Sequence, residues 1–201
     1  MVQTAAELTA RPATDKRQAI LDAAVRLIAR NGLHDTPMSA LAREAGVATG
    51  TLYLYFPSKE AMINALYLEL LEERGRAIIP SGPAPTSASP QEGFWSFWSA
   101  LAHWHLDHPE KANLINQCQV SSILTAETRD TELRMNAEGR AHFERGVASG
   151  TFHYFTVQVF WALVAGPIFV LAQMRDAGEI EITDELLRQT YEGVSRSVLP
   201  S

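Results

Sequence analysis

The chain has 201 residues, 46% of them hydrophobic and 20% charged, which suits one sizeable globular domain or a small domain joined to a larger one. Cys118 is the only cysteine, which excludes an internal disulfide, and the first residues lack an apolar signal core, so we expect a cytoplasmic protein. The formal net charge is −6. Residues 1–60 hold 7 Lys or Arg against 6 Asp or Glu, so the acidic excess lies in residues 61–201. The first part of the chain can therefore still present a basic face to DNA.

The N-terminal part predicts a flexible arm followed by a helix. Residues 1–13 are small and polar, which is typical of a mobile arm. From Thr14 or Asp15 onward, the segment "TDKRQAILDAAVRLIARNG" repeats apolar residues at helical spacing, and Gly32 suits its C-terminal cap. The first helix is therefore expected to end just before Gly32.

Residues 36–56 predict two short helices joined by a tight turn, the arrangement called a helix-turn-helix. Thr36 suits an N-cap, Pro37 suits the first helical position, and Gly46 ends this helix. After a three-residue turn, a second helix is expected over residues 49–55. In DNA-binding proteins with this motif, the second helix enters the major groove.

The second helix combines a small residue with several hydroxyl groups, a composition suited to a DNA surface. Gly50 permits close backbone approach, and base edges or phosphates can bond the hydroxyls of Thr49, Thr51, Tyr53 and Tyr55. We expect Phe56 in the core, since three large aromatic residues this close together cannot all face inward.

Two residues beside predicted helix N-termini are further candidates for DNA contacts. Lys59 lies at the start of the helix that follows Pro57, and Thr36 has the equivalent place at the helix before. Because a helix N-terminus attracts phosphate oxygens, both residues are expected to contact the DNA backbone.

The rest of the chain also predicts helices, after a Pro- and Ser-rich linker at residues 80–91. Helical patterns cover about 91–107, 110–126, 128–148, 154–175 and 183–198, and no strand-like alternation competes with them. We therefore predict an all-α protein of about nine helices. Its expected domains are a three-helix head at residues 14–60 and a larger helical body at residues 61–201.

The segment "FWSFWSALAHWHLDH" at residues 94–108 is rich in aromatic side chains, which allows two interpretations. One is core packing, the commoner role of buried aromatic residues. The other is the wall of a pocket for an aromatic or apolar effector. The pocket candidates are Trp95, Trp98, Trp104, Phe152 and Trp161, with Asn116, Gln117 and Cys118 as polar partners.

The same segment holds three histidines, but their spacing is poor for a metal site. On a helix only His105 and His108 share a face, while His103 points elsewhere. Two ligands need more from other segments, so we expect no metal and no other cofactor.

The segment "FTVQVFWALVAGPIFVLAQM" at residues 155–174 is apolar on every side. It is marginal as a membrane span, because about 20 residues are needed and polar residues interrupt or border it. A helix of this kind is otherwise buried, here against its own subunit on one side and a partner subunit on the other. We therefore expect no membrane association.

The stretch "AGVATGTLYLYFPSKEAM", preceded by "KRQAILDAAVRLIARNG" and "TPMSALA", strongly resembles the DNA-binding domain of the TetR family of transcriptional repressors. The resemblance covers about residues 15–65. It implies a homodimer in which each second helix reads one half of a palindromic operator, and an effector in the body that changes the spacing of the two heads.

The resemblance also assigns roles to individual residues. Thr51, Tyr53 and Lys59 match positions that contact phosphates, and Tyr55 fits a position that is often aromatic. Position 48 is Ala where the family usually has a capping Ser, and Thr49 stands where Lys is common. The positions that can reach base edges are Ser39, Thr49, Gly50 and Leu54. The last two helices match the pair through which the family dimerises, with Phe160, Val164, Phe169, Ile182, Leu186, Thr190 and Val194 as interface candidates.

The predicted function is a ligand-responsive regulator, most simply a repressor that a small apolar or aromatic effector releases from double-stranded DNA. An enzyme is not expected, because the sequence contains no Gly-rich phosphate loop, nucleophile elbow or His-Glu-x-x-His motif. One alternative is a helical ligand-binding or enzyme-like protein with a vestigial DNA-binding head. Another is a constitutive scaffold that binds no ligand.

Overall fold

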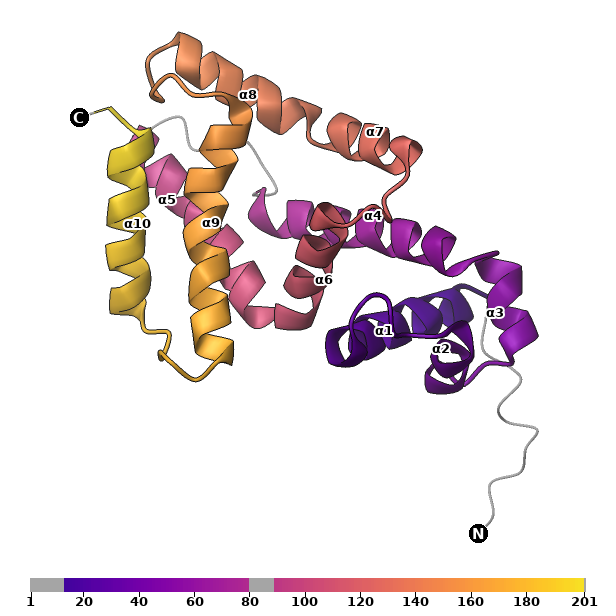
Figure 1. Ribbon diagram of the computed structural model, residues 1–201. Coiled ribbons are helices and arrows are strands. Elements are labelled where there is room, and N and C mark those ends of the chain that lie inside the picture. Colours follow the sequence, from indigo (N-terminus) through magenta and orange to yellow (C-terminus); the bar gives the residue numbers. More distant parts are fainter. Residues whose placement is uncertain (1–12, 80–88, 201) are drawn as a thin grey trace. The chain divides into compact units, whose positions relative to one another are not determined.

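The computed structural model describes residues 13–79 and 89–200, and every regular element in these ranges is an α-helix (Figure 1). The all-α prediction is confirmed, and the predicted arm lies almost wholly outside the described residues. The helices are α1 Ala13–Asn31, α2 Met38–Glu44, α3 Thr49–Tyr55, α4 Lys59–Ile78, α5 Pro90–Asp107, α6 Pro109–Val120, α7 Ala126–Met135, α8 Ala137–Ala148, α9 Val157–Asp176 and α10 Asp184–Val198.

The described ranges contain ten helices where the sequence predicted about nine. The difference comes from the pattern over 128–148, which the structure divides into α7 and α8 at Asn136. Asn136 has φ −89° and ψ 1°, outside the helical region, so a single residue separates the two helices. A periodic pattern that continues across one residue does not show such a break.

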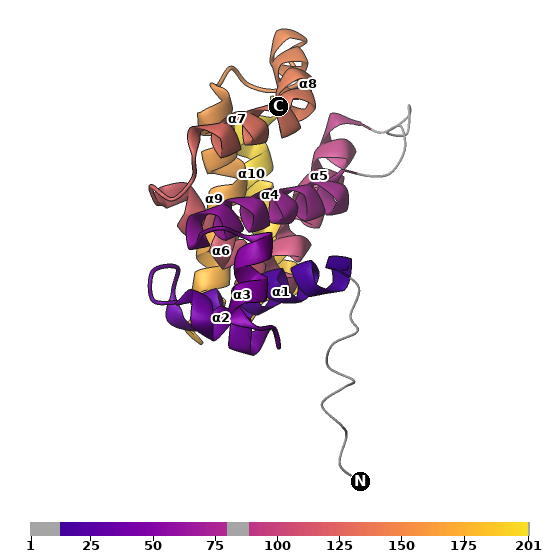
Figure 2. The same ribbon diagram turned by 90° about the vertical axis from the view of Figure 1, so that its right-hand side faces the viewer.

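Helices α1, α2 and α3 pack together as the predicted helix-turn-helix head (Figures 1 and 2). Leu41 of α2 and Leu52 of α3 are completely buried, and they hold the two short helices together. Gly46 has φ +68°, a left-handed conformation that most other residues avoid. This glycine therefore allows the chain to turn sharply from α2 into α3.

The expected N-cap of α2 is wrong. The capping position is occupied by Pro37, and the side chain of Thr36 is completely buried. The Thr36 hydroxyl donates a hydrogen bond to the carbonyl oxygen of Gly32, at 3.0 Å. Thr36 therefore closes the loop that follows α1 instead of capping the helix that follows it.

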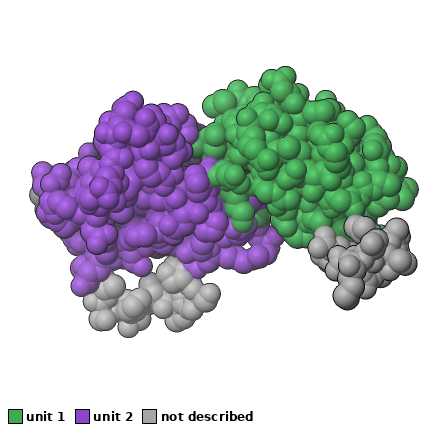
Figure 3. Space-filling view, turned by 90° about the horizontal axis from the view of Figure 1, so that it is seen from below, with its two compact units in different colours: residues 1–69, 110–128 green, residues 70–109, 129–201 purple. Residues whose placement is uncertain are grey.

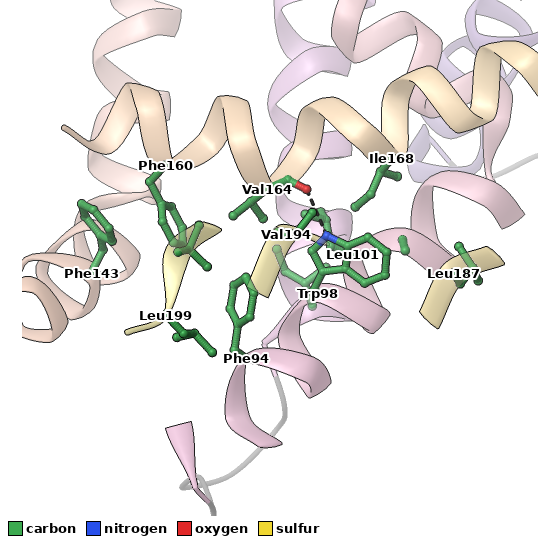
Figure 4. Packing of buried hydrophobic residues seen from close by; sticks show 13 residues of the cluster. Phe94, Trp98, Leu101, Phe143, Phe160, Val164, Ile168, Leu187, Val194 and Leu199 are labelled. Carbon is green, nitrogen blue, oxygen red and sulfur yellow. Dashed lines mark hydrogen bonds between the residues drawn. The ribbon is translucent and has the colours of Figure 1, made fainter. Parts of the chain in front are cut away.

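The body has a core of aromatic and aliphatic side chains from α5, α9 and α10, joined by Phe143 of α8 (Figure 4). Trp98 is completely buried there, and its indole Nε1–H donates to the carbonyl oxygen of Val164, at 3.1 Å. The carbonyl one residue earlier, that of Leu163, is the one that Pro167 cannot bond, because proline has no N–H. Trp98 thus satisfies a carbonyl beside this interruption in the hydrogen bonds of α9.

Helix α8 leaves room for an aromatic ring at Gly146. A Cβ atom built there would lie 2.4 Å from Cδ2 of Phe152, and the ring of Phe152 is in turn packed against those of Phe143 and Phe160. The absence of a side chain at this position therefore allows the ring to lie directly on the helix.

Contacts divide the chain into two compact units (Figure 3). The first comprises Met1–Glu69 and Glu110–Thr128, and the second comprises Leu70–Pro109 and Arg129–Ser201. Helix α6 is thus grouped with the head, and α4 contributes residues to both units as one continuous helix. In the first unit, the amide of Asn64 donates to the Ile123 carbonyl at 2.9 Å and accepts from the Thr125 N–H at 3.0 Å.

Candidate functional site

Helix α3 presents one face to its neighbours and the other to solvent. Leu52 and Phe56 are buried one turn apart and anchor the helix in the head. The side chain of Leu54 is 86% exposed and that of Tyr53 is 49% exposed. Thr49 and Gly50 at the start of the helix are exposed as well. Four of the predicted DNA contacts therefore lie on the solvent face of a firmly held helix.

Two further candidates on α3, Thr51 and Tyr55, are partly buried, and Ser39 on α2 is exposed. The exposed part of α3 thus offers hydroxyl groups, a bare backbone and the apolar side chain of Leu54. Hydroxyls bond phosphates or base edges, and an apolar group suits the methyl group of thymine. No residue of α3 is Lys or Arg, so bidentate recognition of guanine is excluded from this helix.

Lys59 begins α4, as expected, but its ammonium group is engaged within the head. Its Nζ donates to the carbonyl oxygen of His34 at 2.8 Å. Partial burial lowers the pKa of Lys59, while the nearby carboxylates of Asp35 and Glu60 oppose this shift. Lys59 therefore holds the loop before α2 in this conformation with one of its three N–H donors, and its predicted phosphate contact would use the others.

Thr36 does not fit its predicted phosphate contact. Its side chain is completely buried and its hydroxyl is bonded to Gly32, so it offers no group to the surface in this conformation. The reason is that its hydroxyl turns back to the carbonyl of Gly32 at the end of α1. Sequence spacing from the helix start could not show this.

The other cations of the head differ in how far their charge is offset. Arg26 and Arg30 both pair with Glu44, at 3.2 and 3.3 Å. Arg17 pairs with Glu69 and lies over the ring of Phe56. Arg43, in the last turn of α2, has an exposed side chain and was not among the predicted contacts. Because Arg43 is a cation on the first helix of the helix-turn-helix, the sequence could have indicated it as a candidate DNA contact.

The five aromatic candidates for the effector pocket all lie in the second unit but differ in exposure. Trp98 is completely buried and bonded to Val164, so it belongs to the core. Phe152 is half-buried against Phe143 and Phe160. Trp95 and Trp161 are 39% and 38% exposed, and Trp104 is buried outside the cluster around Trp98. Core packing is thus the correct interpretation for Trp98.

The polar candidates for the pocket lie on α6, in the first unit. Asn116 and Gln117 are half-buried, and the Gln117 amide donates to Asn113 at 3.2 Å. Cys118 is completely buried, and burial raises the pKa of its thiol to about 12. A thiol of this kind stays protonated at neutral pH, which excludes a reactive thiolate at this position in the folded protein.

His103 and His105 of α5 and His108, its C-cap, are bonded to the backbone of this helix. The Nδ1 atoms of His103, His105 and His108 each lie 2.7–3.1 Å from the backbone carbonyl four residues earlier. Burial lowers the pKa of His105, and the positive charge of Arg74 acts in the same direction. Within residues 13–79 and 89–200, no three His, Cys, Asp or Glu side chains are grouped to hold a metal ion.

The interface candidates lie on α9, on α10 and, for Ile182, just before α10, and they differ in burial. Phe160, Val164 and Val194 are buried in their own subunit's core, so these three assignments are corrected. Ile182, Leu186 and Thr190 are half-buried, and the Thr190 hydroxyl donates to the Leu186 carbonyl at 2.8 Å. The remaining candidate, Phe169, is 37% exposed.

The outward face of α9 is apolar and carries no charge. It holds Val159, Ala162, Gly166, Phe169 and Val170, which recur at helical spacing, and all except the half-buried Gly166 are exposed. Only 17% of the most apolar 18-residue stretch of α9 is buried within the chain. By length and composition α9 is also able to cross a bilayer, a test that core helices of soluble proteins pass too.

The chain was compared with known proteins. Residues 20–66 match the model of the family described as "Bacterial regulatory proteins, tetR family". A fatty acid metabolism regulator protein of Bacillus subtilis is 50% identical over 54 residues, which are 27% of this chain and 28% of that protein. The regulator EthR of Mycobacterium tuberculosis is 37% identical over 90 residues, or 43% of this chain and 40% of that protein. These matches therefore span less than half of each relative.

The comparison of structures extends over nearly the whole chain. A TetR family transcription regulator from Marinobacter aquaeolei has a TM-score of 0.84 at 24% identity, with 94% of this chain and 97% of that chain covered. A putative TetR family regulator from Vibrio parahaemolyticus has a TM-score of 0.73 at 27% identity, with 92% and 100% covered. The helix-turn-helix head and the family match identify residues 20–66 as a DNA-binding domain of the TetR family of bacterial transcriptional regulators, and the whole chain shares the helical fold of such regulators.

Proposed function

We propose that this protein is a ligand-responsive repressor that binds a palindromic operator as a homodimer. The observation that carries the proposal is the solvent face of α3. Leu52 and Phe56 fix the helix in the head, while Thr49, Gly50, Tyr53 and Leu54 are left exposed. An exposed row of small, hydroxyl and apolar groups on an anchored second helix is suited to the major groove.

The composition of this face determines how we propose that α3 recognises DNA bases. Leu54 contacts a thymine methyl, while Thr49 and Gly50 bring the backbone close to the base edges. Tyr53, Thr51 and Ser39 bond phosphates or bases through their hydroxyls. Without a cation on α3, specificity rests on these contacts and on DNA shape more than on guanine recognition.

The homodimer that we propose is held by α9 together with α10. The outward face of α9 has exposed Val159, Phe169 and Val170 and no charge, as expected for a helix that a second subunit covers. A symmetric pair of heads matches two operator half-sites about 34–36 Å apart. The dimer therefore sets the spacing at which both copies of α3 reach DNA.

The effector acts by preferring one of two arrangements of the heads, since a ligand that binds both equally shifts nothing. We place its site among the aromatic side chains of the body, with Trp95, Trp104 and Trp161 as the remaining lining candidates. An apolar effector is supported by these residues and by the relative that regulates fatty acid metabolism. Helix α4 runs from Lys59 at the head into the second unit, and it provides a continuous connection between the effector-binding body and the DNA-binding head.

The test is binding to the DNA upstream of the protein's own gene, measured by fluorescence anisotropy with the wild type, Leu54→Ala and Val120→Ala. Val120 is 90% exposed on α6, so its truncation controls for the loss of an exposed aliphatic group. A lost base contact costs about 1–3 kcal/mol, so Leu54→Ala should lower the preference for specific over random DNA by roughly tenfold or more. Val120→Ala should bind as the wild type does.

Two results would contradict the proposal. One is a wild-type protein that binds every DNA fragment equally. The other is a Leu54→Ala variant whose preference for the operator is unchanged, which would remove α3 from base recognition.

A further inference from the structure

Trp104, near the C-terminal end of α5, has a buried donor without an acceptor. Its side chain is 4% exposed, and among the described residues its indole Nε1–H is the buried side-chain group that lacks a hydrogen-bond partner. Buried polar groups are almost always bonded, because leaving one unpaired costs about 1–3 kcal/mol. An unpaired donor of this kind indicates a partner that the protein chain itself does not supply.

Trp98, two turns earlier on the same helix, provides an internal comparison. It is equally enclosed, but its Nε1–H reaches the carbonyl oxygen of Val164 at 3.1 Å. Trp98 belongs to the core of α5, α9 and α10 (Figure 4), whereas Trp104 is not part of that cluster. The fold thus satisfies one buried indole on α5 and leaves the other unsatisfied.

The rings around Trp104 do not supply the missing acceptor. His105 and His108 lie with their ring centroids 5.2 and 5.5 Å from that of Trp104, the first edge-on and the second stacked. Each of them uses Nδ1 on a backbone carbonyl, of Leu101 and of Trp104 itself. The Nε2 atoms of these two rings remain as acceptors but do not bond the indole, so its N–H is left as a directed donor beside two flat rings.

We propose that the indole N–H of Trp104 is the donor that binds a neutral oxygen, a carbonyl or an ether, on an otherwise apolar effector. This inference rests on the proposed function, because it names the chemistry of the effector site. An aromatic wall with one directed donor is typical of pockets that orient apolar ligands. One N–H offsets the desolvation of a neutral oxygen, whereas a carboxylate would need several donors or a counter-charge.

The first test compares thermal unfolding of Trp104→Phe and Trp98→Phe without any ligand. Both variants exchange an indole for a smaller ring in a buried place, so the volume change is matched. Trp98→Phe also removes the donor of the Val164 carbonyl and should lower the Tm clearly more than Trp104→Phe, which removes a group that bonds nothing. Equal losses of Tm would show that the Trp104 N–H is satisfied, and would overturn the proposal.

The second test measures binding of two probes of nearly equal shape, 2-acetylnaphthalene and 2-ethylnaphthalene, by calorimetry in the absence of DNA. They differ by a carbonyl in place of a methylene group. The wild type should bind the ketone roughly tenfold more tightly, the factor that a buried hydrogen bond typically contributes. Trp104→Phe should lose this preference, and Trp98→Phe should keep it.

The proposal is overturned if the wild type shows no preference for the ketone or if Trp104→Phe retains one. Operator binding by the same variants is measured separately, by anisotropy. A ketone preference that depends on Trp104 in a protein that fails to bind DNA would contradict the proposed repressor and leave the donor assignment intact. The converse result would remove the donor assignment alone.

Discussion

At the scale of single residues, Gly146 is constrained by lack of space for a side chain. The ring of Phe152 lies where a Cβ atom would be, and it cannot move aside easily because Phe143, Phe160 and Phe94 surround it. Glycine in a helix costs about 1 kcal/mol relative to alanine. The protein tolerates that cost here because the ring requires the space.

We predict that Gly146→Ala lowers the free energy of unfolding by about 1–2 kcal/mol, because the clash with Phe152 exceeds the gain in helix propensity. Gly139 is the matched control, since it lies on the same helix and a Cβ atom added there would have no other atom within 4 Å. Gly139→Ala should raise the stability by about 0.5–1 kcal/mol. Urea unfolding of both variants tests this, and a stabilised Gly146→Ala protein would contradict it.

Cys118 gives a second prediction at this scale, on reactivity and pH. With a folded pKa of about 12, the thiol is ionised in roughly one molecule in ten thousand at pH 8. An aromatic disulfide reagent should therefore label the folded protein very slowly, and the urea-unfolded protein at the rate of a free thiol. Rapid labelling of the folded protein at pH 8 would show that Cys118 is accessible.

The sequence could predict the outward residues of α3 but not every partner within the head. The spacing of Leu52 and Phe56 is local, so it identifies the buried side of the helix and, with it, the exposed side. The bonds of Thr36 to Gly32 and of Lys59 to His34 depend on how the loop after α1 folds. Periodicity contains no information on such loop contacts.

At the scale of elements, α9 shows what composition alone leaves open. Its uniform apolar character predicted burial but not which side meets which neighbour. Phe160 and Val164 point into the subunit, whereas Phe169 lies on the opposite face. The direction became clear only from the packing against α5 and α10.

We predict that Phe169→Glu converts the proposed dimer to a monomer at micromolar concentration, because its interface would then bury two uncompensated carboxylates. Val120→Glu places the same group at an exposed site on α6 and should leave the dimer intact. Sedimentation velocity distinguishes the two species. A Phe169→Glu protein that sediments like the wild type would exclude this face of α9 as the interface.

At the scale of the whole molecule, local sequence patterns were enough to predict the fold, whereas the sites also depend on long-range contacts. Helix lengths and order follow from local patterns, and the described ranges hold ten helices where about nine were expected. The grouping of α6 with the head was not visible, because it depends on long-range contacts such as those of Asn64 with residues 123 and 125. The polar effector candidates therefore fell in a different unit from the aromatic ones.

The proposed dimer makes a prediction about its operator. Once the half-sites are located by footprinting, about 5 base pairs inserted between them, half a helical turn, should move one half-site to the opposite side of the DNA. Affinity should then fall to that of a single half-site, because the two heads can no longer bind together. An insertion that leaves the affinity unchanged would show that each head binds independently.

The uncharged outward face of α9 also bears on how such a regulator diverges after gene duplication. In the proposed symmetric dimer every substitution on this face would occur twice, once in each subunit. A single new acidic residue there would place two like charges together in one paralogue. A compensating change in that paralogue alone would restore its own dimer and exclude the other copy. Few mutational steps thus separate one regulator from two that do not exchange subunits.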